Sequence, residues 1–185
     1  MNRGGEEVMF ENTCRILSRK GHDLYLYEKK NENIIGLEKK INAFFSGIYS
    51  WSTKKELVSI LTSRNFDIAH VHSIYPLISP SVLDVFYQFN IPVVIRCADF
   101  RIISCPIGIH LRKGQICERC LGGREYWCAL KNCRGNIWES VAYAMRSSIA
   151  RKLQLFKNNV TLYVPPSEFV KQRMINVGFQ EERII

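Results

Sequence analysis

The first residues with the type and position for ligand chemistry are Gly4 and Gly5, directly ahead of a helical pattern. Glycines before a helix let the backbone approach an anion, which the free N–H groups and the helix dipole then hold. Taken alone, the pair is a weak signal, and a simple turn without a ligand is its commoner interpretation. Such a turn in α/β proteins normally follows a buried strand, and only three residues precede it here. The sequence therefore indicates a nucleotide-binding-type domain whose first strand is missing.

Two further candidate sets follow expected strands. His70 and His72 point to the same face of one strand, because side chains alternate with period two. His72 ends that strand, where open α/β sheets bind ligands, so it is a catalytic candidate or else a structural histidine; His70 is expected to be a buried, hydrogen-bonded one. Asp99 and Arg101 follow the next strand. The carboxylate would orient a hydroxyl or act as a base and the guanidinium would meet a phosphate, or the two form a local ion pair.

Five of the seven cysteines form the third set: Cys105, Cys117, Cys120, Cys128 and Cys133. A Cys-x-x-Cys pair followed by a second pair is typical of a structural zinc site in which four thiolates bind the metal. We assign Cys117, Cys120, Cys128 and Cys133 to it, with Cys105 as an alternative ligand. Unligated thiols and a redox pair are the other interpretations. The remaining two, Cys14 and Cys97, are expected in the core.

These residues need an alternation of helices and strands to position them. Helices are expected at 6–20, 37–48, 53–62, 80–89, 137–156 and 168–176, with strands at 24–27, 67–72, 92–97 and 160–164, and a further strand beginning at 184–185. The 137–156 helix has an apolar stripe that is expected to pack in the core: Ile137, Val141, Met145, Ile149 and Leu153. This alternation predicts a single domain over 1–185 with an α/β fold, a Rossmann-like parallel sheet with helices on both faces. Residues 99–134 form a cysteine-rich insertion, long for a structureless loop.

The net charge of +9 is concentrated in one region, where 101–157 carries eleven Lys or Arg residues against three acids. A basic region indicates an anionic partner or a solvated basic face. Arg146, Arg151 and Lys152 on the long helix suggest an anionic membrane surface. No nucleic acid is expected, since no basic–aromatic repeat is present. Without a membrane-spanning stretch or a secretory signal, the expected location is cytoplasmic, peripheral at the inner membrane surface if the lipid interpretation holds.

Several segments in order resemble one family. They are Gly4-Gly5-Glu6-Glu7, Glu11-Asn12, 19–23, 67–72, 75–80, 91–94, Asp99-Phe100-Arg101 with Cys105-Pro106, 114–120 and 166–171. This set resembles the N-terminal, acceptor-side domain of GT-B glycosyltransferases of family 4, in the cysteine-bearing subgroup. The resemblance covers nearly the whole chain, and the order and spacing of the segments carry it rather than any one of them.

The resemblance implies retaining transfer of a sugar from a nucleotide-sugar donor to a glycan or lipid-linked acceptor, as in polysaccharide biosynthesis. Two Rossmann-like domains close over a cleft without an obligatory divalent metal. The family's glycine pair lies near the donor diphosphate, which assigns Gly4 and Gly5 to cofactor binding. Its acceptor crevice is lined by loops after the strands, which makes His72, Asp99 and Arg101 the candidates there.

Three departures from the family pattern bear on activity. The first strand is missing, and Ala98 stands where the family commonly has a histidine. The C-terminal domain, which carries the nucleotide-sugar pocket, is also missing, because the chain stops at Ile185. We therefore expect a truncated glycosyltransferase that is inactive by itself. The alternative is a non-catalytic binding or adaptor module stabilised by zinc.

Overall fold

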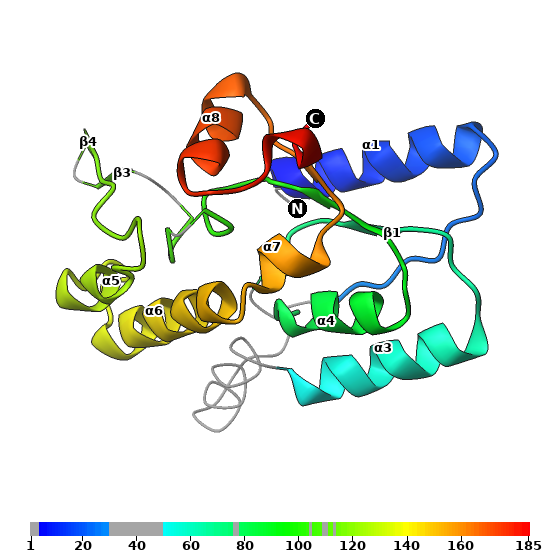
Figure 1. The fold of residues 1–185 in the computed structure, drawn as a ribbon, viewed down its shortest axis with the longest axis horizontal. Helices are drawn as coiled ribbons and strands as arrows, with labels where there is room; N and C mark the ends of the chain where they lie inside the picture. The colour runs from blue at the N-terminus through cyan, green and yellow to red at the C-terminus, as the bar shows by residue number, and fades with distance from the viewer. Residues whose placement is uncertain (1–3, 30–49, 76–77, 104, 109–110, 113) are drawn as a thin grey trace.

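The structure, a computed structural model, is built around a parallel sheet of three strands. It describes residues 4–29, 50–75, 78–103, 105–108, 111–112 and 114–185. The strands follow the order β1-β2-β5, with bounds Ala69–Val71, Val93–Arg96 and Leu162–Val164. Figure 1 shows α1 and α8 (Gly5–Arg19 and Glu168–Asn176) on one side of the sheet, and α3, α4 and α7 (Trp51–Ser63, Ser81–Gln88 and Leu155–Asn159) on the other. The predicted α/β fold, with helices on both faces of a Rossmann-like sheet, is confirmed.

The strands are parallel because each crossover returns the chain to the same end of the sheet. Ala69 pairs with Val93, and Val94 pairs with Leu162. Each crossover contains helices, as parallel strands require. The expected strand at 184–185 is represented by a single parallel bridge, in which Ile184 pairs with Tyr163. The backbone N–H of Ile185 donates to the Tyr163 carbonyl at 3.0 Å.

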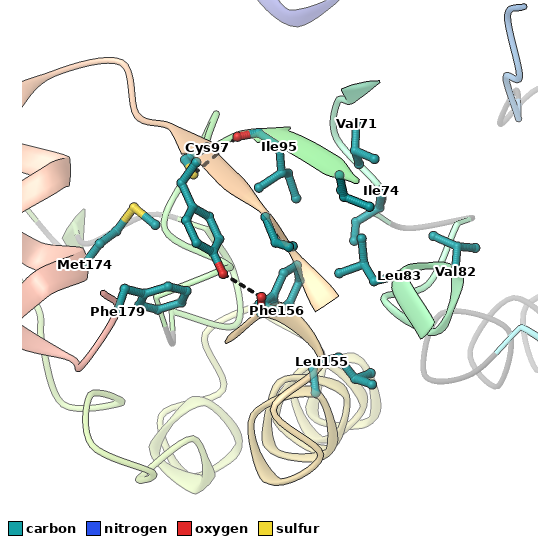
Figure 2. Close-up of a cluster of buried hydrophobic side chains, with 14 of the residues drawn as sticks. Val71, Ile74, Val82, Leu83, Ile95, Cys97, Leu155, Phe156, Met174 and Phe179 are labelled. Atoms are coloured by element: carbon teal, nitrogen blue, oxygen red, sulfur yellow. Dashed lines mark hydrogen bonds between the residues drawn. The ribbon is translucent and has the colours of Figure 1, made fainter. Parts of the chain in front are cut away.

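The core lies between the sheet and the helices that cover it. Figure 2 shows Leu83 of α4, Ile95 of β2 and Phe156 of α7 in one cluster, with Val82 of α4 and Met174 of α8 at its two ends. Tyr163 is also buried here. Its hydroxyl donates a hydrogen bond to the Phe156 carbonyl at 2.5 Å, so the polar end of the buried ring is satisfied. Cys97 is buried as predicted. Cys14, in contrast, is only half-buried, on a helix that buries no side chain fully.

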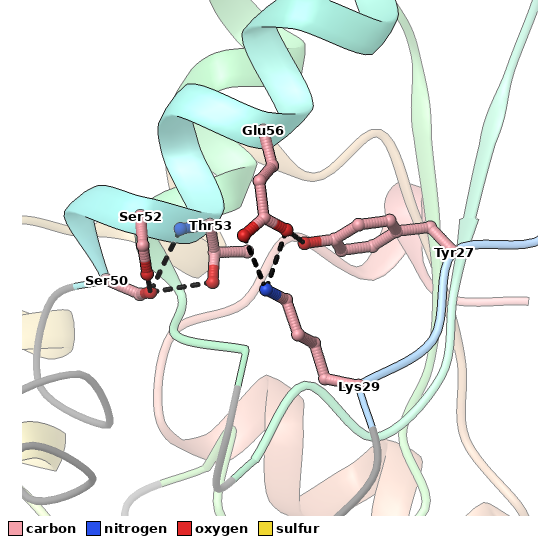
Figure 3. A network of polar contacts seen from close by, with 6 residues as sticks. All are labelled: Tyr27, Lys29, Ser50, Ser52, Thr53 and Glu56. Carbon is pink, nitrogen blue, oxygen red and sulfur yellow. Dashed lines mark hydrogen bonds and ion pairs between the residues drawn. The ribbon is translucent and has the colours of Figure 1, made fainter.

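Helix α3 confirms the helix expected at 53–62 and begins two residues earlier, at Trp51. The cap is Ser50, whose Oγ accepts from the Thr53 backbone N–H at 3.2 Å (Figure 3). Ser50 Oγ also donates to the Thr53 hydroxyl at 2.6 Å. Both side chains are buried, so the cap satisfies polar atoms that water cannot reach.

The strand predicted at 24–27 is wrong, because residues 22–29 form no regular structure. This segment is held to α3 by side chains instead of a backbone ladder. Tyr27 donates its hydroxyl to Glu56 at 2.6 Å, and Lys29 Nζ donates to the other Glu56 oxygen at 2.8 Å (Figure 3). Lys29 first, and then Tyr27, lower the pKa of Glu56. The helix predicted at 37–48 lies outside the described residues.

The long helix predicted at 137–156 is two helices. Helix α6 spans Ile137–Lys152, and Gln154 with φ of 49° separates it from α7. The predicted apolar stripe is wrong: Ile137, Met145 and Leu153 are 49%, 46% and 55% exposed. The buried side chains of α6 are Ser140, Ala142, Ala144, Arg146, Ser147 and Ala150. Small residues on this face allow close packing against its neighbour α5 (Tyr126–Leu130).

The cysteine-rich insertion contains short elements that its sequence did not indicate. A two-stranded antiparallel ribbon pairs β3 with β4, at Leu111–Arg112 and Gln115–Ile116. Helix α5 follows it and packs on α6. The insertion is therefore organised by local hydrogen bonds and by helix packing.

No helix in the described parts of the chain combines the length and the apolar character needed to cross a bilayer.

Candidate functional site

The carboxyl ends of β1 and β2 bring together most of the predicted site residues. His72 follows β1 directly, and Phe10 of α1 contacts it edge-on with ring centroids 5.3 Å apart. Glu6, in the first turn of α1, forms an ion pair with Arg96 at the end of β2. The amino-terminal end of α1 therefore lies at this edge of the sheet. Ligands of open α/β sheets bind at the same edge.

His72 has an environment that keeps its imidazole neutral. Burial, and then His70 and Arg96 nearby, lower the pKa of His72 to about 4. Both ring nitrogens are buried and find no hydrogen-bond partner among the described residues. His70, predicted to be buried and hydrogen-bonded, is instead exposed, with its ring 4.6 Å from that of His72. A neutral imidazole with two unused nitrogens is able to accept one hydrogen bond and donate another.

Backbone strain marks the residue that follows His72. Ser73 has φ of 37°, in the left-handed region that residues other than glycine rarely adopt. Strain of this kind tends to persist where the surrounding structure holds a functional geometry. Ser73 lies two positions after Val71, the last residue of β1.

Asp99 and Arg101 form the local ion pair that was one of the two interpretations of this sequence. The Asp99 carboxylate accepts from the Arg101 backbone N–H at 2.8 Å and from Arg101 Nε at 2.6 Å. Both carboxylate oxygens are therefore engaged. The pair also fixes the Arg101 guanidinium, whose Cζ lies 5.5 Å from the centre of the Tyr75 ring. Tyr75 is three residues from His72, so the two candidate segments meet through it.

Arg146 is buried, although the sequence predicted it to be on the surface. The sequence counts it in a basic surface facing a membrane, but its side chain is 3% exposed. Its Cζ lies 3.8 Å from the Tyr75 ring and 4.2 Å from the Tyr143 ring, and its Nη2 donates to the Pro106 carbonyl at 3.3 Å. Stacking on two aromatic rings stabilises a guanidinium away from water. Spacing alone could not reveal this contact, because Tyr75 and Arg146 are distant in the chain.

Gly4 and Gly5 lie at the amino end of α1 as predicted, with open space around both α-carbons. The first turn of α1 already carries two carboxylates. Glu7 accepts from the Gly4 backbone N–H at 3.2 Å, and Glu6 pairs with Arg96. An anionic ligand would compete with Glu7 for this N–H group. The assignment of the glycine pair to a donor diphosphate stays a prediction.

The five cysteines of the insertion lie in one region without converging on a point. Burial, and then neighbouring cysteines including Cys105 and Cys133, raise the pKa of Cys120 to about 12. Burial and the same neighbours raise the pKa of Cys128 to about 12. Among the described residues, no three side chains of metal-binding type are arranged to hold an ion. These two thiols are therefore protonated at neutral pH in this arrangement, and the zinc site stays a prediction.

Comparison with known proteins adds no assignment: no family model, no curated protein and no solved structure matches this chain.

Proposed function

We propose that this chain provides the acceptor-side domain of a retaining glycosyltransferase of the GT-B type, family 4. The observation that supports the proposal is that α1 contacts His72 and Arg96 at the carboxyl edge of a parallel sheet, and that the Asp99–Arg101 pair lies in the loop that follows β2 at the same edge. This is the edge where a sugar acceptor and a nucleotide-sugar donor would approach each other. The ordered set of sequence segments described above supplies the family.

His72, Arg101 and Asp99 have different roles in this proposal. His72, neutral and without a described partner, exchanges hydrogen bonds with a sugar hydroxyl. The guanidinium of Arg101, oriented by Asp99, contacts an anionic group of the donor or acceptor. Asp99 positions Arg101 and does not act as the base, because both its oxygens accept from that residue.

A glycan-binding measurement on the chain as it exists tests the acceptor role. We expect saturable binding to at least one glycan of an array, weakened about tenfold by His72→Leu, because the leucine side chain can neither donate nor accept a hydrogen bond. His70→Leu, which changes an exposed residue of β1, is the matched control. Transfer from a nucleotide sugar, with a donor domain supplied as a separate polypeptide, would extend the result to catalysis. No saturable glycan binding and no transfer would refute the proposal.

A structural zinc ion is a separate proposal, carried by the sequence spacing and by the gathering of five cysteines in the insertion. Zinc would bind thiolates, so it would have to displace protons that burial now favours. We expect about one zinc per chain by elemental analysis, lost in Cys120→Ser and kept in Cys14→Ser, whose site is on α1. Metal-free protein with unchanged stability would leave the thiols unligated and remove the adaptor alternative.

A further inference from the structure

A pocket of about 620 Å³ lies away from α1, between the loop after β2, helices α6 and α7, and the end of α8. Its volume is in the range of small-molecule sites. Among the described residues that line it, five are basic and none is acidic. The basic ones are Arg101, Arg124, Arg151, Lys157 and Arg173.

Three of these guanidiniums form ion pairs with carboxylates, and none of the three carboxylates lines the pocket. The ion pairs are Arg101–Asp99, Arg151–Glu125 at 2.6 Å and Arg173–Glu118 at 2.8 Å. Arg151 uses Nε and Nη2 for Glu125, which leaves Nη1 for another acceptor. The carboxylates therefore orient the forks while part of each remains available for a ligand.

Arg124 and Lys157 supply charge that no described carboxylate neutralises. Arg124 Nε donates to the Leu121 carbonyl at 3.1 Å, and Lys157 Nζ donates to the Val177 carbonyl at 2.9 Å. Both residues keep further N–H groups. Two separate sides of the pocket thus present an excess of cationic donors, one near α5 and one at α7.

Gly123 and Gly178 make room for Arg151 and Lys157, because a glycine has no side chain. A β-carbon on Gly123 would come within 3.0 Å of the Arg151 guanidinium, and one on Gly178 within 3.0 Å of Lys157 Nζ. Both glycines have positive φ, which side chains disfavour. Ser147 adds a hydroxyl to the lining that is 6% exposed and has no hydrogen-bond partner among the described residues. This hydroxyl is therefore free to form a hydrogen bond with a water molecule or with a ligand in the pocket.

Most of the remaining lining is apolar, while Gln154 and Asn176 are polar, and the apolar residues include Ile102, Ile103, Leu121 and Phe156. We propose that this pocket binds a diphosphate ester, with its two phosphoryl groups on the basic side chains and an apolar or planar substituent on these residues. Phosphate oxygens match the forks of arginine, and two phosphoryl groups match cations on two sides. The pocket shares Arg101 with the proposed acceptor site, and its test therefore uses Arg124 and Lys157, which do not belong to that site.

A structural role for the cations makes the opposite prediction. Arg151 is in the last turn of α6, and Lys157 donates to a carbonyl at the end of α8. Cations at helix carboxyl ends stabilise the helix without any ligand. If that were their whole role, the pocket would bind no anion saturably.

Calorimetric titration with inorganic pyrophosphate separates the two roles. We expect one saturable site on the intact chain, weakened by salt, and weakened about tenfold or more by Arg124→Met and by Lys157→Met. Lys152→Met, an exposed cation on α6 outside the pocket, is the matched control and should bind as the native chain does. If Lys157→Met lowers the melting temperature, Arg124→Met decides, because Arg124 is exposed. No saturable binding, or equal binding by all variants, would overturn the proposal.

Two esters distinguish the source of the diphosphate. Uridine diphosphate and a short prenyl diphosphate would each place a substituent on the apolar residues, one planar and one aliphatic. Binding of one of them more tightly than pyrophosphate identifies the class and supports the apolar contact. If neither exceeds pyrophosphate, the apolar part of the proposal is refuted.

Discussion

His72 shows how much a single residue's function depends on neighbours that sequence cannot reveal. The sequence places it at the end of a strand, and in the structure it directly follows β1, which ends at Val71. The lowered pKa depends first on burial beside Phe10, and then on His70 and Arg96. Phe10 belongs to a helix that is far away in the chain. The position was therefore predictable, whereas the charge state was not.

The neutral state of His72 makes stability depend on pH. Its pKa in the folded chain is about 4, below the usual value near 6.5, so the unfolded chain binds more protons between these values. Stability should therefore fall as pH decreases below about 6.5, by at most about 1.4 kcal/mol per pH unit from this group. Urea unfolding at pH 7 and pH 5.5 measures the effect. His72→Asn should flatten the dependence, with His22→Asn as an exposed control, and an unchanged slope would contradict the assignment.

Among the secondary-structure elements, helix caps and helix breaks determine whether the predicted helix bounds are correct. Helix α8 spans Glu168–Asn176 as expected, and Ser167 caps it, because the Ser167 Oγ accepts from the Val170 N–H. The helix predicted at 137–156 divides because Gln154 adopts a left-handed conformation, which its residue type does not suggest. The predicted buried face of α6 is also wrong, because mainly small residues and Arg146 are buried there in place of the apolar stripe. Local signals thus predict the bounds of α8, and they miss the break at Gln154 and the buried face of α6.

The α3 cap gives a direct test of one such local signal. Ser50→Ala removes the acceptor of the Thr53 N–H and the partner of the Thr53 hydroxyl, both buried. We expect a loss of about 1–2 kcal/mol in the free energy of unfolding. Ser52→Ala changes an exposed side chain of the same turn and is the control. Equal stability of the two variants in urea unfolding would show that Ser50 does not cap the helix.

In the whole molecule, one buried guanidinium joins segments that the sequence treats separately. Arg146 of α6 contacts Tyr75 after β1 and the Pro106 carbonyl in the insertion. The layers and the strand order follow from the alternation of helices and strands, so the sequence predicts them. The contact of three distant segments does not follow from any period or motif. The site was therefore predicted as a set of positions, and its arrangement came from tertiary packing.

The register of the sheet has a consequence for the order of folding. Ala69 reaches Val93 within one helical crossover, while the contact of Val93 with Thr161 spans 68 residues. Closing the longer loop loses more chain entropy, so β1 and β2 should pair before β5 joins them. Pulse-labelled hydrogen exchange would then protect Val71 before Tyr163, and the reverse order would contradict this. The cysteine-rich insertion lies inside the longer loop, so its cysteines would stay accessible to oxidants until the last strand is in place.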